Sequence, residues 1–261
     1  MKIATWNINS IRLRKENVIN FLKKEKIDII CLQETKTPNK YFPLTFFHKY
    51  GFNHSYIRGE KSYNGVAILS KFPFKNKSFN NFCNSCDTRH IKIQLKNNII
   101  IHNFYVPAGG DIADINKNPK FKHKLDFMKE MTKFLKNEKY QKRIILGDFN
   151  IAPLENDVWS HKSLLNVVSH TKIETKSFEK LLKEGAFEDI IRNNFKCDDK
   201  IYSWWSYRNK NWKKNDKGRR LDHILISKNM QKYIQNVKIY KSIRDEKKPS
   251  DHVPISITIE I

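Results

Sequence analysis

The 261-residue sequence has few cysteines, and their spacing argues against a zinc or redox centre. Only four are present. Cys31 lies inside an apolar run, where a small buried thiol is expected. Cys83 and Cys86 form a single C-x-x-C pair, with no second pair and no spaced histidines to complete a zinc site. The pair therefore indicates metal or redox chemistry only weakly.

Long apolar runs are also missing. No stretch reaches eighteen consecutive apolar residues, so the sequence predicts no membrane-spanning helix. The opening residues MKIATWNINS contain no apolar signal core and enter a predicted strand at once. We therefore expect a cytoplasmic protein. Linkers and short-period repeats are absent as well, and the length suits a single domain over residues 1–261 with a sizeable core.

Acidic residues are scarce relative to basic ones. The chain has 50 Lys and Arg against 27 Asp and Glu, a formal net charge of +23. A field of this sign attracts polyanions such as nucleic acids. The sequence is also rich in Lys, Asn and Ile throughout, as drift toward A·T-rich codons would produce. Charge therefore favours a nucleic-acid partner without deciding the matter.

The hydrophobic pattern predicts many strands and fewer helices. Apolar residues at helical spacing predict three helices. One covers residues 12–26, one begins after the start signal Asn118–Pro119, and one ends near Gly185. Mixed or antiparallel sheets covered by helices fit this order better than a parallel wound sheet. The predicted strands cover 3–8, 27–32, 65–69, 99–105, 143–146, 202–207, 221–226, 237–240 and 253–259.

Polar residues stand where these apolar strands end or begin. RIILGDFN is the clearest case, because a strand expected to be dry turns at Gly147 and then presents two polar side chains. C-terminal ends of some strands and N-terminal ends of antiparallel neighbours share one sheet edge. We therefore expect these side chains to converge. They are Asn7, Glu34, Tyr105, Asp148, Asn150, Asp222, Asp251 and His252.

Such a cluster predicts a divalent cation. Several carboxylates repel one another in a partly dry site unless a cation neutralises them. Carboxylate and amide oxygens suit Mg²⁺ or Mn²⁺ rather than zinc. An acid-ringed ion on a basic protein fits a phosphodiester substrate. Taken singly, each residue is also an ordinary turn, cap or core residue, so the prediction depends on the joint pattern.

Eight motifs together resemble one family. ATWNINSIR, DIICLQETK, NGVAILSK, NFYVPAGG, LGDFNIAP, YSWWSYR, RRLDHILIS and SDHVPISI resemble the exonuclease III family of AP endonucleases, most closely its bacterial exodeoxyribonuclease III branch. They follow the family order from residue 2 to about residue 258. The resemblance implies an α/β fold, a four-layered α/β/β/α sandwich of two mostly antiparallel, mixed sheets with outer helices, like that of DNase I.

The resemblance also implies roles for the clustered residues. Glu34 would bind the essential Mg²⁺ with Asn7 beside it, and Asp251 is a further metal-ligand candidate. Asp148 would activate or position the attacking water, and Asn150 would hold the phosphate; both are also metal-ligand candidates, because the number of ions is open. Tyr105 would contact the phosphate or help the leaving group. His252 would bind the phosphate, paired with Asp222.

Further residues are candidates for DNA contacts. Trp204 and Leu221 match positions of an abasic-sugar pocket in the family. Two residues depart from the pattern: Ala108 replaces an amide of some relatives, and Arg219 stands where animal relatives carry a Trp. The basic segment 208–220 suggests a DNA-binding loop, or else a solvated loop with one partly buried Trp. The DNA-binding candidates are Trp204, Tyr207, Arg208, Trp212, Arg219 and Leu221.

The combined hypothesis is a DNA repair nuclease that uses Mg²⁺, with Mn²⁺ as a substitute. It would cleave 5′ to abasic sites in double-stranded DNA, trim damaged 3′ ends and act as a monomer. One alternative keeps the chemistry but takes RNA or another phosphate ester. A second alternative, a DNA-binding module without catalysis, requires a broken metal site, whereas Glu34, Asp148, Asp222 and His252 are all present.

Overall fold

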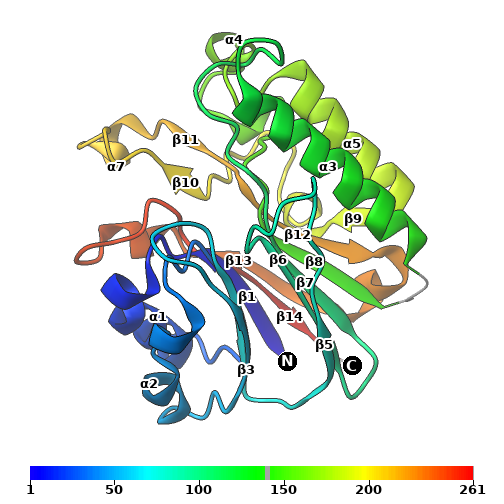
Figure 1. Ribbon diagram of the computed structural model, residues 1–261. Helices are drawn as coiled ribbons and strands as arrows, with labels where there is room; N and C mark the ends of the chain where they lie inside the picture. The colour runs from blue at the N-terminus through cyan, green and yellow to red at the C-terminus, as the bar shows by residue number, and fades with distance from the viewer. Residues whose placement is uncertain (139–141, 261) are drawn as a thin grey trace.

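The computed structural model describes residues 1–138 and 142–260 and has four layers (Figure 1). Two six-stranded sheets lie face to face, and helices cover the outer face of each. This is the architecture that the resemblance implied. The first sheet has the strand order β13 (Ile234–Ile239), β14 (Ile255–Ile259), β1 (Lys2–Asn7), β2 (Ile29–Gln33), β4 (Val66–Ser70) and β3 (His54–Arg58).

The second sheet carries Tyr105, Asp148 and Asp222, three of the polar residues that the sequence singled out. Its strands alternate in direction apart from one parallel pair at the centre. The order is β5 (Phe74–Ser78), β6 (His90–Leu95), β7 (Ile100–Tyr105), β8 (Arg143–Asp148), β12 (Asp222–Ser227) and β9 (Phe187–Asp189).

Helices cover the two outer faces. α1 (Ile11–Lys24) and α2 (Leu44–His48) lie on the first sheet, and α3 (Pro119–Asn137) packs beside α5 (Lys172–Gly185) on the second (Figure 1). None of the helices in the described ranges has the length and apolar character needed to cross a membrane. The shorter elements are η1 (Asn39–Tyr41), η2 (Glu155–Asp157), α4 (His161–Leu164), α6 (Ile190–Asn193), β10 (Trp204–Trp205), α7 (Trp212–Asn215), β11 (Gly218–Arg219), η3 (Lys228–Tyr233) and η4 (Lys241–Asp245).

The core between the sheets is built largely from isoleucine. Strand residues at alternate positions face inward, as the period of two requires. Ile3 and Ile29 from the first sheet meet Ile101, Ile144 and other residues of the second, all fully buried. β-branched side chains pack well on a pleated surface. Two further apolar clusters form, one between each sheet and the helices on its outer face.

The two parallel strand pairs bring the predicted site residues together. β1 runs parallel to β2 and β7 runs parallel to β8, so the C-terminal ends of these strands lie at matching edges. Tyr105 therefore stands directly beside Asp148. β12 is antiparallel to β8 and begins at that edge, with Asp222 opposite Asp148. The convergence predicted from the sequence is present.

One strand prediction was wrong. The sequence pattern predicts a strand over 202–207, but only β10, Trp204–Trp205, forms. The hydroxyl of Ser203 accepts hydrogen bonds from the backbone N–H groups of Leu221 and Asp222. These side-chain hydrogen bonds replace the backbone hydrogen bonds of a regular strand pair, so the segment forms only a two-residue strand. The other predicted strands form with shifts of a few residues, and α5 ends at Gly185 as predicted.

Gly147 allows β8 to lie close to β7. Its φ is 138°, and a Cβ atom there would stand 1.9 Å from the carbonyl oxygen of Phe104. Backbone cannot yield as a flexible side chain can. We expect Gly147→Ala to destabilise the protein by about 3 kcal/mol or more, measured as the free energy of unfolding in urea.

Gly51 supplies the matched control. Its φ of 86° is also positive, but nothing lies within 4 Å of a Cβ atom built there. Gly51→Ala should therefore cost only the conformational penalty of about 1 kcal/mol. Equal losses in the two variants would show that the close approach to Phe104 is not what requires glycine at 147.

Candidate active site

The amide of Asn7 joins the two halves of the site. Its Nδ2 donates to Glu34 Oε1 and to Asp148 Oδ2, both at 2.9 Å. Asn7 ends β1, and Glu34 directly follows β2, whereas Asp148 ends β8 in the other sheet. One amide group thus spans the gap between the sheets. Glu34 and Asp148 thus share a single hydrogen-bond donor group, and the donor Asn7 lies 141 positions from Asp148.

Glu34 is an ionised carboxylate in a nearly closed environment. The hydroxyl of Tyr105 donates to Glu34 Oε1 at 2.9 Å, and Lys36 Nζ lies 2.8 Å from Oε2. Burial alone would raise the pKa of Glu34, but the Lys36 ammonium and the Asn7 amide outweigh it and lower the pKa. Burial, with the nearby Glu34 and Asp148, holds the pKa of Tyr105 well above its ordinary value, so its phenol is a proton donor.

Asp148, Asp222 and His252 form a second, buried group. His252 Nδ1 lies 2.8 Å from Asp222 Oδ2, and His252 Nε2 lies 3.7 Å from Asp148 Oδ2. Burial opposes the imidazolium, but Asp222 and Asp148 favour it and raise the pKa of His252 to about 10. Burial raises the pKa of Asp148 to about 7, against the opposing charge of His252. Asp148 is therefore poised to exchange a proton near neutral pH.

Two site residues adopt a left-handed backbone conformation. Glu34 has φ 49° and Asn150 has φ 53°, a region that non-glycine residues rarely enter and that clusters at functional sites. The sharp turn brings Asn150 back onto β8. Its backbone N–H donates to Asp148 Oδ1 at 2.9 Å, and its Nδ2 donates to the Val106 carbonyl at 2.9 Å and to Asp148 Oδ2 at 3.2 Å.

Asp251 lies at the margin of the group, beyond Asn9. Asn9 Nδ2 donates to Asp251 Oδ1 at 3.0 Å, and Lys36 Nζ donates to Asn9 Oδ1 at 2.6 Å. Trp204 Nε1 donates to Asp251 Oδ2 at 3.0 Å. Burial works against the carboxylate, but His252 and these two donors lower its pKa. Asp251 is thus an ionised group held by neutral donors.

The residues present fit a hard divalent cation. The ligand atoms available are carboxylate and amide oxygens, which Mg²⁺ and Mn²⁺ prefer. Asp222 Oδ1 is buried and has no hydrogen-bond partner among the residues that the structure describes. Asp148, Asp222 and His252 can bring three ligand atoms within 4.8 Å of one another. A protonated His252 has no free lone pair, however, so the ligands that fit best are Glu34, Asp148 and their amide neighbours.

The pocket candidates Trp204, Arg219 and Leu221 lie together. Trp204 and Leu221 belong to one apolar cluster, and the guanidinium carbon of Arg219 lies 5.4 Å from the Trp204 ring centroid. Tyr207 is partly exposed and its hydroxyl donates to the carbonyl of Pro249 at 2.9 Å. The residues that the resemblance assigns to the pocket wall are therefore neighbours, and their role in a pocket stays a prediction.

The basic loop differs from its expected form at one residue. Trp212 is half-buried, with its ring 5.2 Å from that of Trp205 in an edge-on contact. This matches the alternative of a solvated loop with one partly buried Trp. Arg208, Lys213 and Lys214 are exposed. The loop presents charge to solvent, and a DNA contact by its residues stays a prediction.

The sequence analysis missed a buried ion pair behind the site. Lys124 and Glu174 are fully buried and bonded to each other, and Lys124 Nζ also donates to the Asn150 carbonyl at 2.7 Å and to the Ala108 carbonyl at 3.3 Å. Glu174 closes a capping box with Thr171 at the start of α5. The T-x-x-E pattern was a readable signal for that cap, but nothing local linked it to Lys124.

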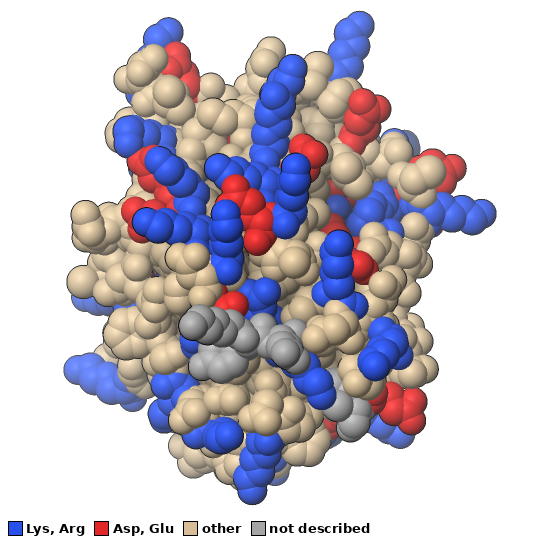
Figure 2. Space-filling view, turned by 90° about the vertical axis from the view of Figure 1, so that its right-hand side faces the viewer, with Lys and Arg blue, Asp and Glu red and all other residues tan. Residues whose placement is uncertain are grey.

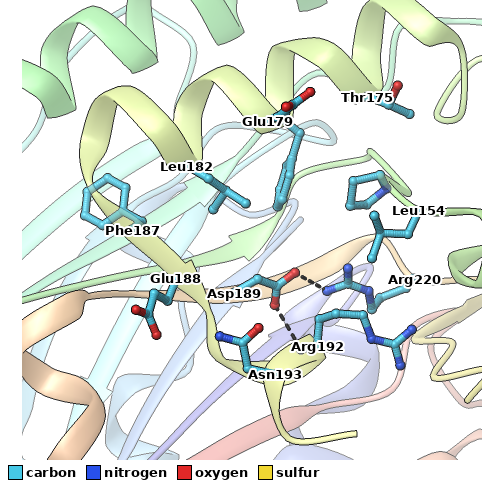
Figure 3. Close-up of a pocket in the computed structure, with 12 residues that line it drawn as sticks. Leu154, Thr175, Glu179, Leu182, Phe187, Glu188, Asp189, Arg192, Asn193 and Arg220 are labelled. Atoms are coloured by element: carbon cyan, nitrogen blue, oxygen red, sulfur yellow. Dashed lines mark hydrogen bonds and ion pairs between the residues drawn. The ribbon is translucent and has the colours of Figure 1, made fainter. Parts of the chain in front are cut away.

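Arg220 fixes the start of β12, next to the site. It donates to both oxygens of Asp157, at 2.8 and 2.7 Å, and to Asp189 at 2.6 Å. Figure 3 shows Arg220 and Asp189 facing each other at the floor of a hollow of about 540 Å³ beneath α5. The lining of this hollow includes none of the predicted site residues. The cluster therefore supports Asp222 from behind.

Basic side chains are not confined to the site. Figure 2 shows Lys and Arg interspersed with Asp and Glu over the face near the end of α3. Dispersed charge of this kind fits the codon-drift alternative for part of the net charge. The cysteines play no part either: all four are free, and none belongs to a candidate metal group in the described ranges. The site is marked by its acids, not by the overall charge.

Comparison with known proteins agrees with this geometry. Residues 4–252 match the model of the endonuclease/exonuclease/phosphatase family. The chain is 31% identical to exodeoxyribonuclease III of Haemophilus influenzae, over 98% of both chains. It is 28% identical to an exodeoxyribonuclease of Bacillus subtilis over the full length of both.

Solved structures give the same result. An AP endonuclease from Archaeoglobus fulgidus matches with a TM-score of 0.92 and 32% identity, over 100% of both chains. A Neisseria 3′ phosphatase, NExo, bound to a product DNA hairpin, also matches with a TM-score of 0.92, at 30% identity over 100% of both chains. The chain thus belongs to the endonuclease/exonuclease/phosphatase family, as a metal-dependent phosphodiester hydrolase homologous over its full length to exodeoxyribonuclease III and the AP endonucleases.

Proposed function

We propose that this protein is a Mg²⁺-dependent DNA repair nuclease. It hydrolyses the phosphodiester on the 5′ side of an abasic site, leaving a 3′-hydroxyl, and it removes nucleotides or blocking groups from 3′ ends. The observation that carries the proposal is the pair of linked groups around Asn7: the ionised Glu34 on one side and Asp148 with His252 on the other. The relatives' names, which include nucleases, an AP endonuclease and a 3′ phosphatase, support DNA as the substrate.

Asp148 and His252 divide the proton chemistry. Asp148, with a pKa near 7, takes a proton from the attacking water. His252 carries its proton at neutral pH and donates to a phosphate oxygen, which stabilises the negative charge of the transition state. Asp222 holds the imidazolium in place through Nδ1. Asn150 keeps Asp148 oriented through its backbone N–H.

Glu34, Asn7 and the carboxylate of Asp148 would hold Mg²⁺, and Asp251 is a further candidate ligand. When bound, the ion supplies Lewis-acid stabilisation of charge on the phosphate and the departing 3′ oxygen. The Tyr105 hydroxyl remains protonated; its one proton is donated to Glu34 Oε1, so it would donate to the phosphate only by turning away from Glu34. The abasic sugar enters the pocket beside Trp204 and Leu221, since a nucleotide that lacks its base is easier to extrude.

The acids should be essential for cleavage but not for binding. Glu34→Ala and Asp148→Ala should each lower cleavage of a duplex with one abasic analogue by at least about a thousandfold, because each removes a group that acts on the reacting atoms. Duplex affinity should largely survive. End-labelled duplex with and without Mg²⁺, and with excess EDTA, provides the measurement.

Glu179→Ala is the control for these variants, since that carboxylate lines the remote hollow. Its cleavage rate should equal that of the wild type. Full turnover by Glu34→Ala or Asp148→Ala, or by the wild type in excess EDTA, would refute the assignment. Comparing the abasic duplex with an RNA-containing duplex tests the substrate: faster cleavage of RNA would overturn the proposal of a DNA repair enzyme.

The raised pKa of His252 depends on Asp222. In metal-free protein, titration of the His252 ring followed by NMR should show a pKa of about 10. Asp222→Asn removes the main charge that favours the imidazolium, so the pKa should fall by at least about two units. The same variant should lower the cleavage rate at neutral pH, where the wild-type ring is protonated. A pKa that does not change would contradict this electrostatic role of Asp222.

The basic loop should contribute salt-dependent affinity. Lys214 is exposed, Lys213 Nζ lies 3.1 Å from Asp245 with its side chain 75% exposed, and Lys217 Nζ lies over the Trp159 ring. Replacing all three lysines with Ala should weaken duplex binding. It should also reduce the slope of log affinity against log salt concentration by the amount expected for the loss of about two to three phosphate contacts. An unchanged slope would assign the loop to the solvated alternative.

A further inference from the structure

Arg219 is a cation without an acidic partner beside the candidate active site. Its Nη1 donates to two neutral oxygens, the Val168 carbonyl at 3.0 Å and the Ser169 hydroxyl at 2.8 Å. Within residues 1–138 and 142–260 it makes no ion pair with a carboxylate. Its neighbour Arg220 is saturated by Asp157 and Asp189. No carboxylate of the described ranges is therefore paired directly with Arg219, although the buried Glu174 is near enough to favour its charge.

The sheet register places Arg219 in a row with His252. Arg219 stands opposite Trp204 between β11 and β10, and Trp204 in turn bridges to His252. Directly opposed residues carry their side chains on the same face of a sheet. Arg219, Trp204 and His252 therefore point the same way, and Arg219 lies two strand spacings, roughly 10 Å, from His252. That separation suits a group one or two bonds beyond a phosphate held at His252.

The surroundings of Arg219 leave part of its guanidinium available. The Trp204 ring supports one face of it, and the wall below is apolar, with Leu221 and Ala152 both buried. A guanidinium has five donor N–H groups, yet only Nη1 has hydrogen-bond partners in the described part of the chain. The Nε and Nη2 donors remain, in the planar arrangement that matches a carboxylate.

We propose that Arg219 binds a carboxylate on the lesion side of the scissile phosphate. The protein then favours DNA 3′ ends blocked by the phosphate ester of a short hydroxy acid, such as a 3′-phosphoglycolate, over a neutral abasic sugar. A neutral sugar would cover the guanidinium without compensating its charge, which is costly. The proposal rests on the proposed function and specifies its substrate class.

The reaction is the hydrolysis already proposed. Water adds its oxygen to phosphorus, the bond between phosphorus and the 3′ oxygen breaks, and that oxygen gains a proton. The products are a 3′-hydroxyl end and free phosphoglycolate. Arg219 takes no part in the bond changes; it binds the carboxylate of the phosphoglycolate group, while the 3′ oxygen of the DNA is the leaving group, and thereby sets specificity.

Three duplex substrates and three variants test the proposal. The substrates carry a 3′-phosphoglycolate, its neutral 3′-phosphoglycolamide counterpart, or an internal abasic analogue. Arg219→Gln can keep the contacts to Val168 and Ser169 but loses the charge, and Arg219→Lys keeps the charge but loses the planar pair of donors. Lys217→Ala removes a charge from the same loop at a site that faces Trp159 instead. Thermal unfolding of each variant verifies that it folds.

The wild type should cleave the carboxylate substrate about 10- to 100-fold more efficiently, in kcat/KM, than the carboxamide. Arg219→Gln should bring that ratio close to one, and its loss on the carboxylate substrate should exceed any loss on the carboxamide and abasic duplexes. Arg219→Lys should give an intermediate ratio, and Lys217→Ala should keep the wild-type ratio.

Two results would overturn the proposal. A wild-type ratio near one would show that the carboxylate is not recognised. An equal loss on all three substrates in Arg219→Gln would show that Arg219 contacts the DNA backbone or has a structural role. An error in the proposed function itself would give a different result: the wild type would cleave none of the three duplexes in the presence of Mg²⁺.

Discussion

The structure depends on the crowding of buried acids where two sheets meet. Glu34 and Asp148 come from different sheets and share the amide of Asn7, and Asp222 is balanced by the imidazolium of His252. Carboxylates in so dry a place are held apart from water and close to each other, which raises the free energy of the ionised state. The unfavourable free energy of these charges is offset by function, because the site presents charges already positioned for a phosphate ester and a hard cation.

The fold creates this crowding through the direction of its strands. Each sheet has one parallel pair at its centre, and the two pairs end at neighbouring edges. Left-handed turns at Glu34 and Asn150 then direct the chain back over the strand ends. Behind them, Lys124 draws the Asn150 and Ala108 carbonyls toward α3. The site is thus supported by buried ionic contacts from the helix layer as well as by the sheets.

Most of the strand positions and the convergence of polar residues could be predicted from the sequence, because both follow from local patterns. Apolar alternation located β1, short apolar runs located β7 and β8, and polar residues at their ends predicted the edge where they meet. What failed depended on contacts between distant segments. Ser203 interrupts the strand predicted over 202–207 through its bonds to β12. Lys124 looked like any other lysine of α3, since its partner Glu174 lies 50 residues away.

The isoleucine layer between the sheets has an effect beyond stability. It is the spacer that fixes the separation of two half-sites, one in each sheet, which are linked by the Asn7 amide, by the bond from Tyr105 to Glu34 and by the His252–Asp222 pair. A methylene removed from that layer lets the sheets approach or slide by a fraction of an ångström, and the two carboxylates move with them. We therefore expect the catalytic rate of this protein to depend on core volume, so that residues far from any substrate tune its activity.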